Sequence, residues 1–303
     1  MEELKTHIKV PDEFLRPHKE LHNIFGDGIA RVFSYDFSTA NKCYENRVAA
    51  VSLVASVCYS NEKSLGSISL FDRLACESHS LPSSSFEFVP VLLNPRESSH
   101  ALLLSQLDSN VRKYGEWIED DKYLLTNYRA LVYDCEKHVK DLTDENNINS
   151  IKKLYLEIYN TDAECKIIQK HFKVFQYKVD LPTMGQMVRH RVNWQVLSRR
   201  YVSGKKVPFE FYISDKMQNV VSNEGETSTT QLLELCVEHY FKAIADGVKA
   251  EDARRIIPQG AYTTFWGAYQ PQQLENFFKL RLDSHAQKEI RLVAQAMQEM
   301  IKD

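Results

Sequence analysis

The chain has 303 residues, of which 43% are hydrophobic and 26% are charged, and its formal net charge is -3. This balance is typical of a globular protein long enough for one large or two modest domains, and it excludes a disordered or collagen-like chain. The slightly acidic charge argues against a nucleic-acid partner, because surfaces that follow phosphates carry a surplus of lysine and arginine.

Membrane insertion and metal binding find no support in the sequence. No stretch approaches the roughly eighteen apolar residues of a membrane span, and residues 1–5 lack the basic-then-apolar profile of a secretory signal. We therefore expect a cytoplasmic protein without a membrane partner. The six cysteines are scattered and are expected to be reduced thiols. His18 and His22 are four residues apart but lack a third ligand, so no metal site is expected.

The first 95 residues predict a strand followed by two helices. Residues 29–35 alternate as a strand does, and residues 38–58 have apolar side chains at helical spacing. A second helix is expected over residues 69–78. Beyond Pro82, the alternating aromatic residues Phe86 and Phe88 predict another strand.

Residues 97–170 form a long, charged segment with helical periodicity. Apolar side chains recur at helical spacing from Leu107 to Ile118 and again from Tyr128 to Leu142. The polar run at 144–147 is expected to break the pattern before a further helix begins at Ile151. We therefore expect this segment to be helical throughout.

The remaining elements are expected to alternate between strands and helices. Residues 172–179 predict a strand and residues 183–190 a short helix. Residues 209–213 are expected to form a strand and residues 214–229 a polar loop. Residues 230–245 then predict an amphipathic helix, which Asp246 and Gly247 close.

Basic residues are concentrated between positions 189 and 201, with four arginines and one histidine in thirteen residues. Such a cluster is either a solvated basic face or an anion-binding site. Further along, Arg254 and Arg281 lie in apolar surroundings and would be partly buried cations, which require a carboxylate or a ligand anion. Glu289 or Asp283 could serve structurally. A bound phosphate is the favoured explanation, since each charge-assisted hydrogen bond contributes about 1.5 to 3 kcal/mol.

Three groups of residues resemble the flavin-dependent thymidylate synthases. Arg189-His190-Arg191 is followed by Ser198 after six residues, where the family has seven. Residues 247–290 match the family pattern Gly-Val, Ala-Arg-x-x-Leu-Pro, Tyr-Thr-x-Phe, Asn-Phe-Leu-x-Leu-Arg and His-Ala-Gln-x-Glu-Ile nearly position for position. A weaker match surrounds His79 and Pro82. Residues 97–170 depart from the family.

This resemblance implies one α/β (α+β) domain over residues 1–303, with a central, mostly antiparallel sheet flanked by helices. Residues 97–170 would be a helical insertion, which either packs on the main domain or a neighbouring subunit, or forms a lid over the substrate. The implied reaction is the reductive methylation of dUMP to dTMP, with carbon from methylenetetrahydrofolate and with NADPH reducing a bound FAD. The implied assembly is a homotetramer whose sites are shared between subunits.

The resemblance also assigns roles to single residues. Arg281 would be catalytic, lying against the uracil and stabilising its ionised N3. The residues implied to bind dUMP are Gln186, Arg189, Ser198, Arg200, Arg254 and Arg281. Those implied to contact FAD are Ser85, Arg189, His190, Arg191, Asn276 and His285.

Several positions depart from the family pattern. Ser84 and Ser85 replace Glu-His, and a serine cannot stack on a flavin ring. Gln195-Val196 replaces Asn-Glu, and residues 270–272 replace Asn-x-Arg. Two alternatives therefore stay open. One is a flavin- and folate-dependent methylase or hydroxymethylase of another pyrimidine nucleotide, and the other is a non-catalytic nucleotide-binding paralogue.

Overall fold

A five-stranded antiparallel sheet forms the centre of the protein. The computed structural model describes residues 6–26, 30–75, 82–106, 114–222 and 227–302. The strands are β1 (Lys19–His22), β2 (Arg31–Tyr35), β6 (Lys173–Asp180), β7 (Asn193–Val196) and β8 (Tyr262–Tyr269), in the order β1-β2-β6-β8-β7. Every neighbouring pair is antiparallel. The predicted fold class, a mixed α/β protein with a mostly antiparallel sheet, is confirmed.

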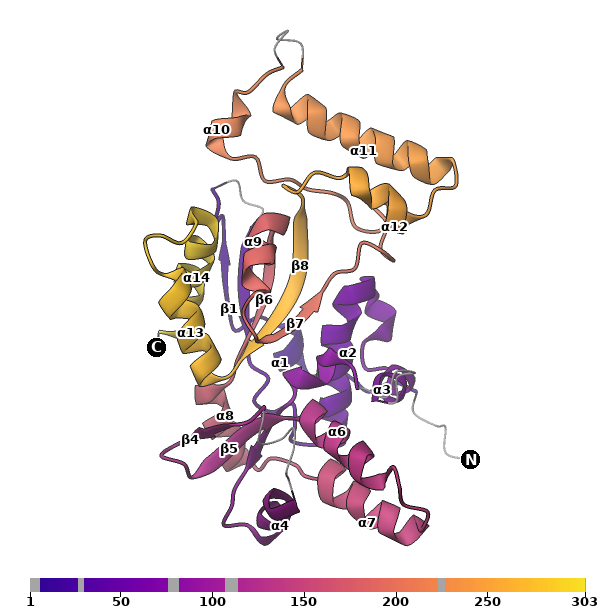
Figure 1. Cartoon of the computed structure of the whole chain (residues 1–303), viewed down its shortest axis with the longest axis vertical. Coiled ribbons are helices and arrows are strands. Elements are labelled where there is room, and N and C mark those ends of the chain that lie inside the picture. The colour runs from indigo at the N-terminus through magenta and orange to yellow at the C-terminus, as the bar shows by residue number, and fades with distance from the viewer. Residues whose placement is uncertain (1–5, 27–29, 76–81, 107–113, 223–226, 303) are drawn as a thin grey trace.

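Helices cover both faces of this sheet (Figure 1). On one face, α9 (Leu181–Met187), α13 (Pro271–Arg281) and α14 (Lys288–Ile301) enclose a core that includes Tyr177 and Phe265. On the other face, α2 (Tyr44–Tyr59) shares a core with alternate residues of the same strands, such as Trp266. Side chains alternate between the two faces of a strand, and helices cover each face. Both faces of β6 and β8 are therefore buried.

The N-terminal part differs from the predictions at three places. It contains α1 (Asp12–Leu15), α3 (Ile68–Ala75) and the 3-10 turns η1 (Glu62–Ser64) and η2 (Ser84–Phe88). The helix expected from residue 38 begins at Tyr44. The strand expected around Phe86 and Phe88 is wrong, because this stretch forms the 3-10 turn η2. Both aromatic side chains are fully buried within it. Strand β1 was not predicted.

The segment 97–170 is not helical throughout, so that prediction is wrong in part. It contains α4 (Ser98–Gln106), α6 (Tyr128–Val139), α7 (Glu145–Leu156) and α8 (Asp162–His171). It also contains β4 (Glu116–Ile118) and β5 (Tyr123–Asn127), which form a second sheet with β3 (Pro90–Leu93) in the order β3-β5-β4.

The errors in this segment come from two turns. Residues Glu119, Asp120 and Asp121 all have positive φ angles, between 52° and 59°, and join β4 to β5 as a tight hairpin. The polar run at 144–147 starts a helix instead of breaking one, because the Asp144 side chain accepts a hydrogen bond from the Asn146 amide at 2.9 Å. Leu107 and Val111 lie outside the described residues.

A buried arginine fastens this segment to the rest of the protein. Arg47 of α2 donates to Asn41 Oδ1 at 2.5 Å and to the carbonyl oxygens of Leu156 and Ile158. Its guanidinium lies 4.1 Å from the ring centres of both Tyr128 and Tyr159. Hydrogen bonds and cation–π contacts thus satisfy a cation that burial would otherwise destabilise.

The helical module of residues 215–256 projects from one end of the central sheet (Figure 1). It comprises α10 (Asp215–Gln218), α11 (Thr229–Ala245), α12 (Ala250–Ala253) and η3 (Arg254–Ile256). Helix α11 begins with a capping box and ends before Gly247, whose φ is 88°, so the predicted helix is confirmed. The strand expected at 209–213 is wrong, because this stretch forms a single bridge between Phe211 and Ala261. Among the described residues, no helix is long and apolar enough to span a membrane.

Candidate ligand-binding site

The Arg189-His190-Arg191 stretch lies in the turn between α9 and β7. The Asp180 side chain caps α9 by accepting a hydrogen bond from the Thr183 amide at 3.1 Å, and the helix ends at Met187. The chain then turns towards α13. A pocket of about 680 Å³ results, lined by the following residues: Arg189, His190, Arg191, Val192, Gln272, Gln273, Asn276, Leu280 and Arg281. We call it the arginine pocket.

A hydrogen bond between Arg281 and His190 organises this pocket. Arg281 Nε donates to His190 Nε2 at 2.7 Å, and Arg281 Nη2 donates to the Gln186 carbonyl oxygen at 3.2 Å. Since Nε2 accepts, a neutral His190 carries its hydrogen on Nδ1. Burial, together with the charge of Arg281, lowers the pKa of His190 to about 4. The imidazole is therefore a neutral acceptor that orients a permanent cation.

The charge of the arginine pocket is not compensated by protein groups. Its lining contains three arginines and no carboxylate. Within the described part of the chain, neither Arg189 nor Arg191 forms an ion pair, and Arg281 bonds only neutral acceptors. Such a concentration of guanidinium groups favours a ligand with phosphate or carboxylate oxygens.

A second group of predicted residues lies at a different pocket, of about 410 Å³. Ser198 and Arg254 line it together with apolar side chains and Arg199. Arg254 Nε donates to the Glu251 carbonyl oxygen at 3.2 Å. Outside this pocket, Arg200 forms an exposed ion pair of 2.7 Å with the Glu251 carboxylate. A phosphate at Arg200 would have to compete with that carboxylate.

The remaining predicted residues do not line either pocket. Ser85 is fully buried, and its hydroxyl donates to Ser83 Oγ at 3.1 Å. The side chain of His285 is 95% exposed and pairs with Asp283 at 2.8 Å. Gln186 contributes its carbonyl oxygen to Arg281, while its side chain donates to Gln287 at 2.6 Å. One chain therefore brings together Arg189, His190, Arg191, Asn276 and Arg281, but not the other predicted residues.

Sequence reasoning missed a further pocket, of about 680 Å³, beside the arginine pocket. We call it the segment pocket, because Glu116, Arg129 and Tyr133 of the segment 97–170 line it, together with Glu87. It shares four lining residues with the arginine pocket, namely Arg191, Val192, Gln272 and Gln273. No motif marks this pocket, since it is created only where the segment meets β7 and α13.

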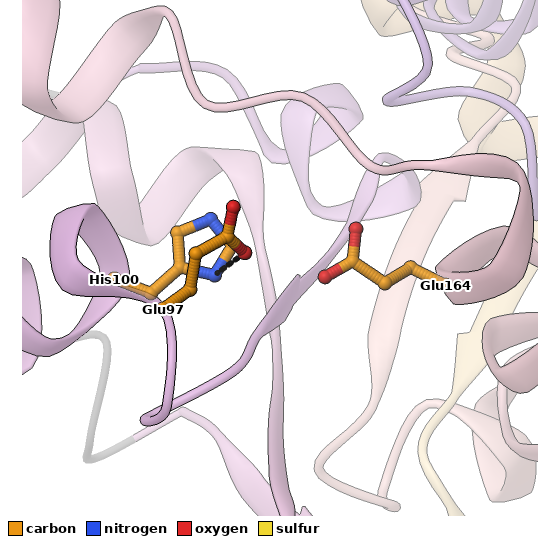
Figure 2. Close-up of side chains that lie close together, drawn as sticks. All are labelled: Glu97, His100 and Glu164. Carbon is orange, nitrogen blue, oxygen red and sulfur yellow. Dashed lines mark ion pairs between the residues drawn. The ribbon is translucent and has the colours of Figure 1, made fainter.

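A cluster of Glu97, His100 and Glu164 lies apart from these pockets, with its potential ligand atoms within 4.8 Å of one another (Figure 2). The Asn94 amide donates to His100 Nδ1 at 3.0 Å, so the hydrogen of a neutral ring lies on Nε2 and blocks that nitrogen as a metal ligand. Glu164 caps α8 by accepting from the Thr161 amide and hydroxyl at 2.7 and 3.0 Å. Structural hydrogen bonds thus account for His100 and Glu164, while the Glu97 carboxylate lies 3.4 Å from His100 Nδ1.

The fold and the arginine pocket define an α/β protein with a strongly cationic pocket at the end of its central sheet. A sequence model of the family described as thymidylate synthase complementing protein matches residues 113–303. The chain belongs to this family, because the match covers more than half of its length.

Curated relatives carry the name flavin-dependent thymidylate synthase. The relative from Sulfurisphaera tokodaii is 29% identical over 174 residues, which are 54% of this chain and 62% of the relative. The relative from Aquifex aeolicus is 29% identical over 206 residues, or 63% of this chain and 60% of the relative. The chain thus matches about three fifths of their lengths.

A solved structure was also found, a UMP/dUMP methylase from Streptomyces cacaoi bound with 5-Br UMP. It is 24% identical to this chain, and the alignment has a TM-score of 0.36. It covers 42% of this chain and 67% of the methylase.

Proposed function

We propose that the protein catalyses the FAD-dependent reductive methylation of dUMP to dTMP, with methylenetetrahydrofolate as the carbon donor and NADPH as the reductant. The observation that carries this proposal is the arginine pocket, in which Arg189, Arg191 and Arg281 face a space without carboxylates. The names of the curated relatives refer to a flavin and to thymidylate synthesis. Flavin nucleotides and thymidylate both carry phosphates, which these cations fit.

Arg281 is the residue proposed to act on the pyrimidine. Of its five N–H groups, one is held by His190 and one by the Gln186 carbonyl oxygen, which leaves three for a ligand. A cation fixed in this way can stabilise negative charge on a pyrimidine nitrogen without first having to reorient. His190 positions Arg281, and its neutral state avoids repulsion between two cations.

The neighbouring residues fit a flavin cofactor. Arg189 and Arg191, which form no ion pair with the described residues, offer guanidinium groups for phosphate, and Asn276 offers an amide for a ring edge. When bound, the flavin supplies the electrons that reduce the transferred one-carbon unit to a methyl group. The protein's own contribution is to anchor the phosphates and to orient the pyrimidine.

The separation of the two groups of residues supports an assembly of several chains. Ser198 and Arg254 line a pocket that shares no residue with the arginine pocket. Two leucines of α11, Leu232 and Leu235, are each more than half exposed. Apolar side chains at the surface suit a contact with a neighbouring chain. We propose a homotetramer, located in the cytoplasm, in which these groups meet across subunits.

A reconstitution assay tests the proposal. The purified protein is incubated with FAD, dUMP, methylenetetrahydrofolate and NADPH, and the nucleotide products are analysed by mass spectrometry. Formation of dTMP is expected, and its absence with FAD bound would contradict the proposal. A methylated or hydroxymethylated product from another pyrimidine nucleotide would identify the first alternative. Nucleotide binding without FAD uptake would identify a non-catalytic paralogue.

A further inference from the structure

The segment pocket has preorganised walls. The carboxylate of Glu116 accepts hydrogen bonds from the Gln272 amide at 3.0 and 3.1 Å, which ties β4 to the start of α13. Gln270 Nε2 donates to the Tyr114 carbonyl oxygen at 2.9 Å, and Gln273 Nε2 donates to the Arg191 carbonyl oxygen at 3.1 Å. Because these contacts hold the walls of the pocket in place, binding there requires little ordering of the protein.

Apart from Arg191, which it shares with the arginine pocket, the charged groups of the segment pocket are held by other protein groups. Glu87 and Arg129 form a partly buried ion pair of 2.6 Å, and Arg129 Nε also donates to the Pro82 carbonyl oxygen at 2.7 Å. The Glu116 carboxylate is engaged with the N-terminal end of α13. The two adjacent pockets therefore suit a ligand with an anionic part and an uncharged polar part.

Two groups in the segment pocket fit a nitrogen heterocycle. Tyr133 lines the pocket and has no hydrogen-bond partner among the residues that the structure describes, so its ring and hydroxyl are available. Glu87, held in place by Arg129, has acceptor capacity left for an amino group. A volume of about 680 Å³ lies within the range of small-molecule sites.

We propose that the segment pocket binds the adenine ring of an adenosine diphosphate moiety, whose phosphates lie against Arg189 and Arg191 in the arginine pocket. Tyr133 contacts the ring, and Glu87 accepts a hydrogen bond from its amino group. FAD and NADPH both contain this moiety. The choice between these two sources rests on the proposed function. The segment 97–170 would thereby complete a ligand site instead of serving only as packing.

The test compares ligands that have or lack this moiety. Binding of ADP, FAD and FMN to the full chain, freed of flavin, is measured by calorimetry for the wild type, Tyr133→Ala and Glu87→Gln. Lys137→Ala, an exposed change one turn further along α6, is the matched control. We expect Tyr133→Ala to weaken ADP and FAD binding by about 10-fold or more, as loss of a base–aromatic contact does. FMN binding should change less than about 2-fold.

The outcomes separate this inference from the proposed function. If wild-type protein does not bind ADP, or if Tyr133→Ala weakens FMN as much as FAD, the inference is overturned even where dTMP is formed. If dTMP is not formed but ADP binding still depends on Tyr133, the inference stands alone. Displacement of ADP by NADPH from protein already loaded with FAD would identify NADPH as the source, and ADP binding only to flavin-free protein would identify FAD. Glu87→Gln removes the charged partner of Arg129. If Glu87→Gln fails to fold, Tyr133→Ala decides the outcome.

Discussion

Replacement of His190 by glutamine should change how stability depends on pH. In the folded protein, burial and Arg281 lower the pKa of His190 to about 4, whereas an unfolded chain has an ordinary histidine with a pKa of about 6.5. Between these values the unfolded chain binds a proton that the folded chain does not. Stability is therefore lost as the pH falls from about 6.5 towards 4. Glutamine can accept the bond from Arg281 but does not titrate.

The size of the effect follows from these two pKa values. Each pH unit within the window contributes at most about 1.4 kcal/mol. The full difference between the two pKa values would therefore give about 2 kcal/mol between pH 7 and pH 5. His190 lies beside an open pocket, and water there reduces the difference. We expect the wild type to lose about 1 to 2 kcal/mol more than His190→Gln over this range.

Urea unfolding followed by circular dichroism at pH 7 and pH 5 measures this difference. His285→Gln is the matched control, since the His285 side chain is 95% exposed and its replacement should leave the pH dependence unchanged. An identical loss of stability in wild type and His190→Gln would refute a neutral, buried imidazole at the Arg281 contact. The contact between His190 and Arg281 would then have to differ from a 2.7 Å hydrogen bond.

Three further substitutions test the site and the packing. Arg281→Ala should abolish dTMP formation without lowering the urea midpoint appreciably, and retained turnover would contradict its proposed role. Arg47→Met should destabilise the protein by about 3 to 5 kcal/mol in urea unfolding, because the buried carbonyl oxygens of the 97–170 segment lose their donor, and an unchanged midpoint would contradict that attachment. Gly267→Ala should cost about 1 to 3 kcal/mol in thermal unfolding, since its Cβ would lie 2.6 Å from the Trp194 ring, and a neutral effect would show that this ring can move aside.

Local patterns predicted two strands of the central sheet, β2 and β6, but missed β1, β7 and β8. The strand at 172–179 is correct because its valine, phenylalanine and tyrosine residues favour a strand, and the helix at 230–245 carries both a capping box and a closing glycine. The strand expected near Phe86 failed because alternating aromatic residues also suit a buried 3-10 turn. Hairpin β4–β5 was missed because its turn uses three non-glycine residues with positive φ.

For the candidate site, the sequence alone singled out Arg189, His190, Arg191, Asn276 and Arg281, because unusual residue types in a fixed order do not depend on the fold to be noticed. Tertiary structure decided how these residues meet. It placed His190 as the neutral acceptor for Arg281, which depends on burial and on one hydrogen bond.

The structure also separated the Ser198 and Arg254 pocket from the arginine pocket, and it created the segment pocket from residues with no motif in common. Sequence order fixes which groups are available along the chain. Only contacts between elements far apart in the chain determine which of those groups share a cavity, and with what charge and protonation.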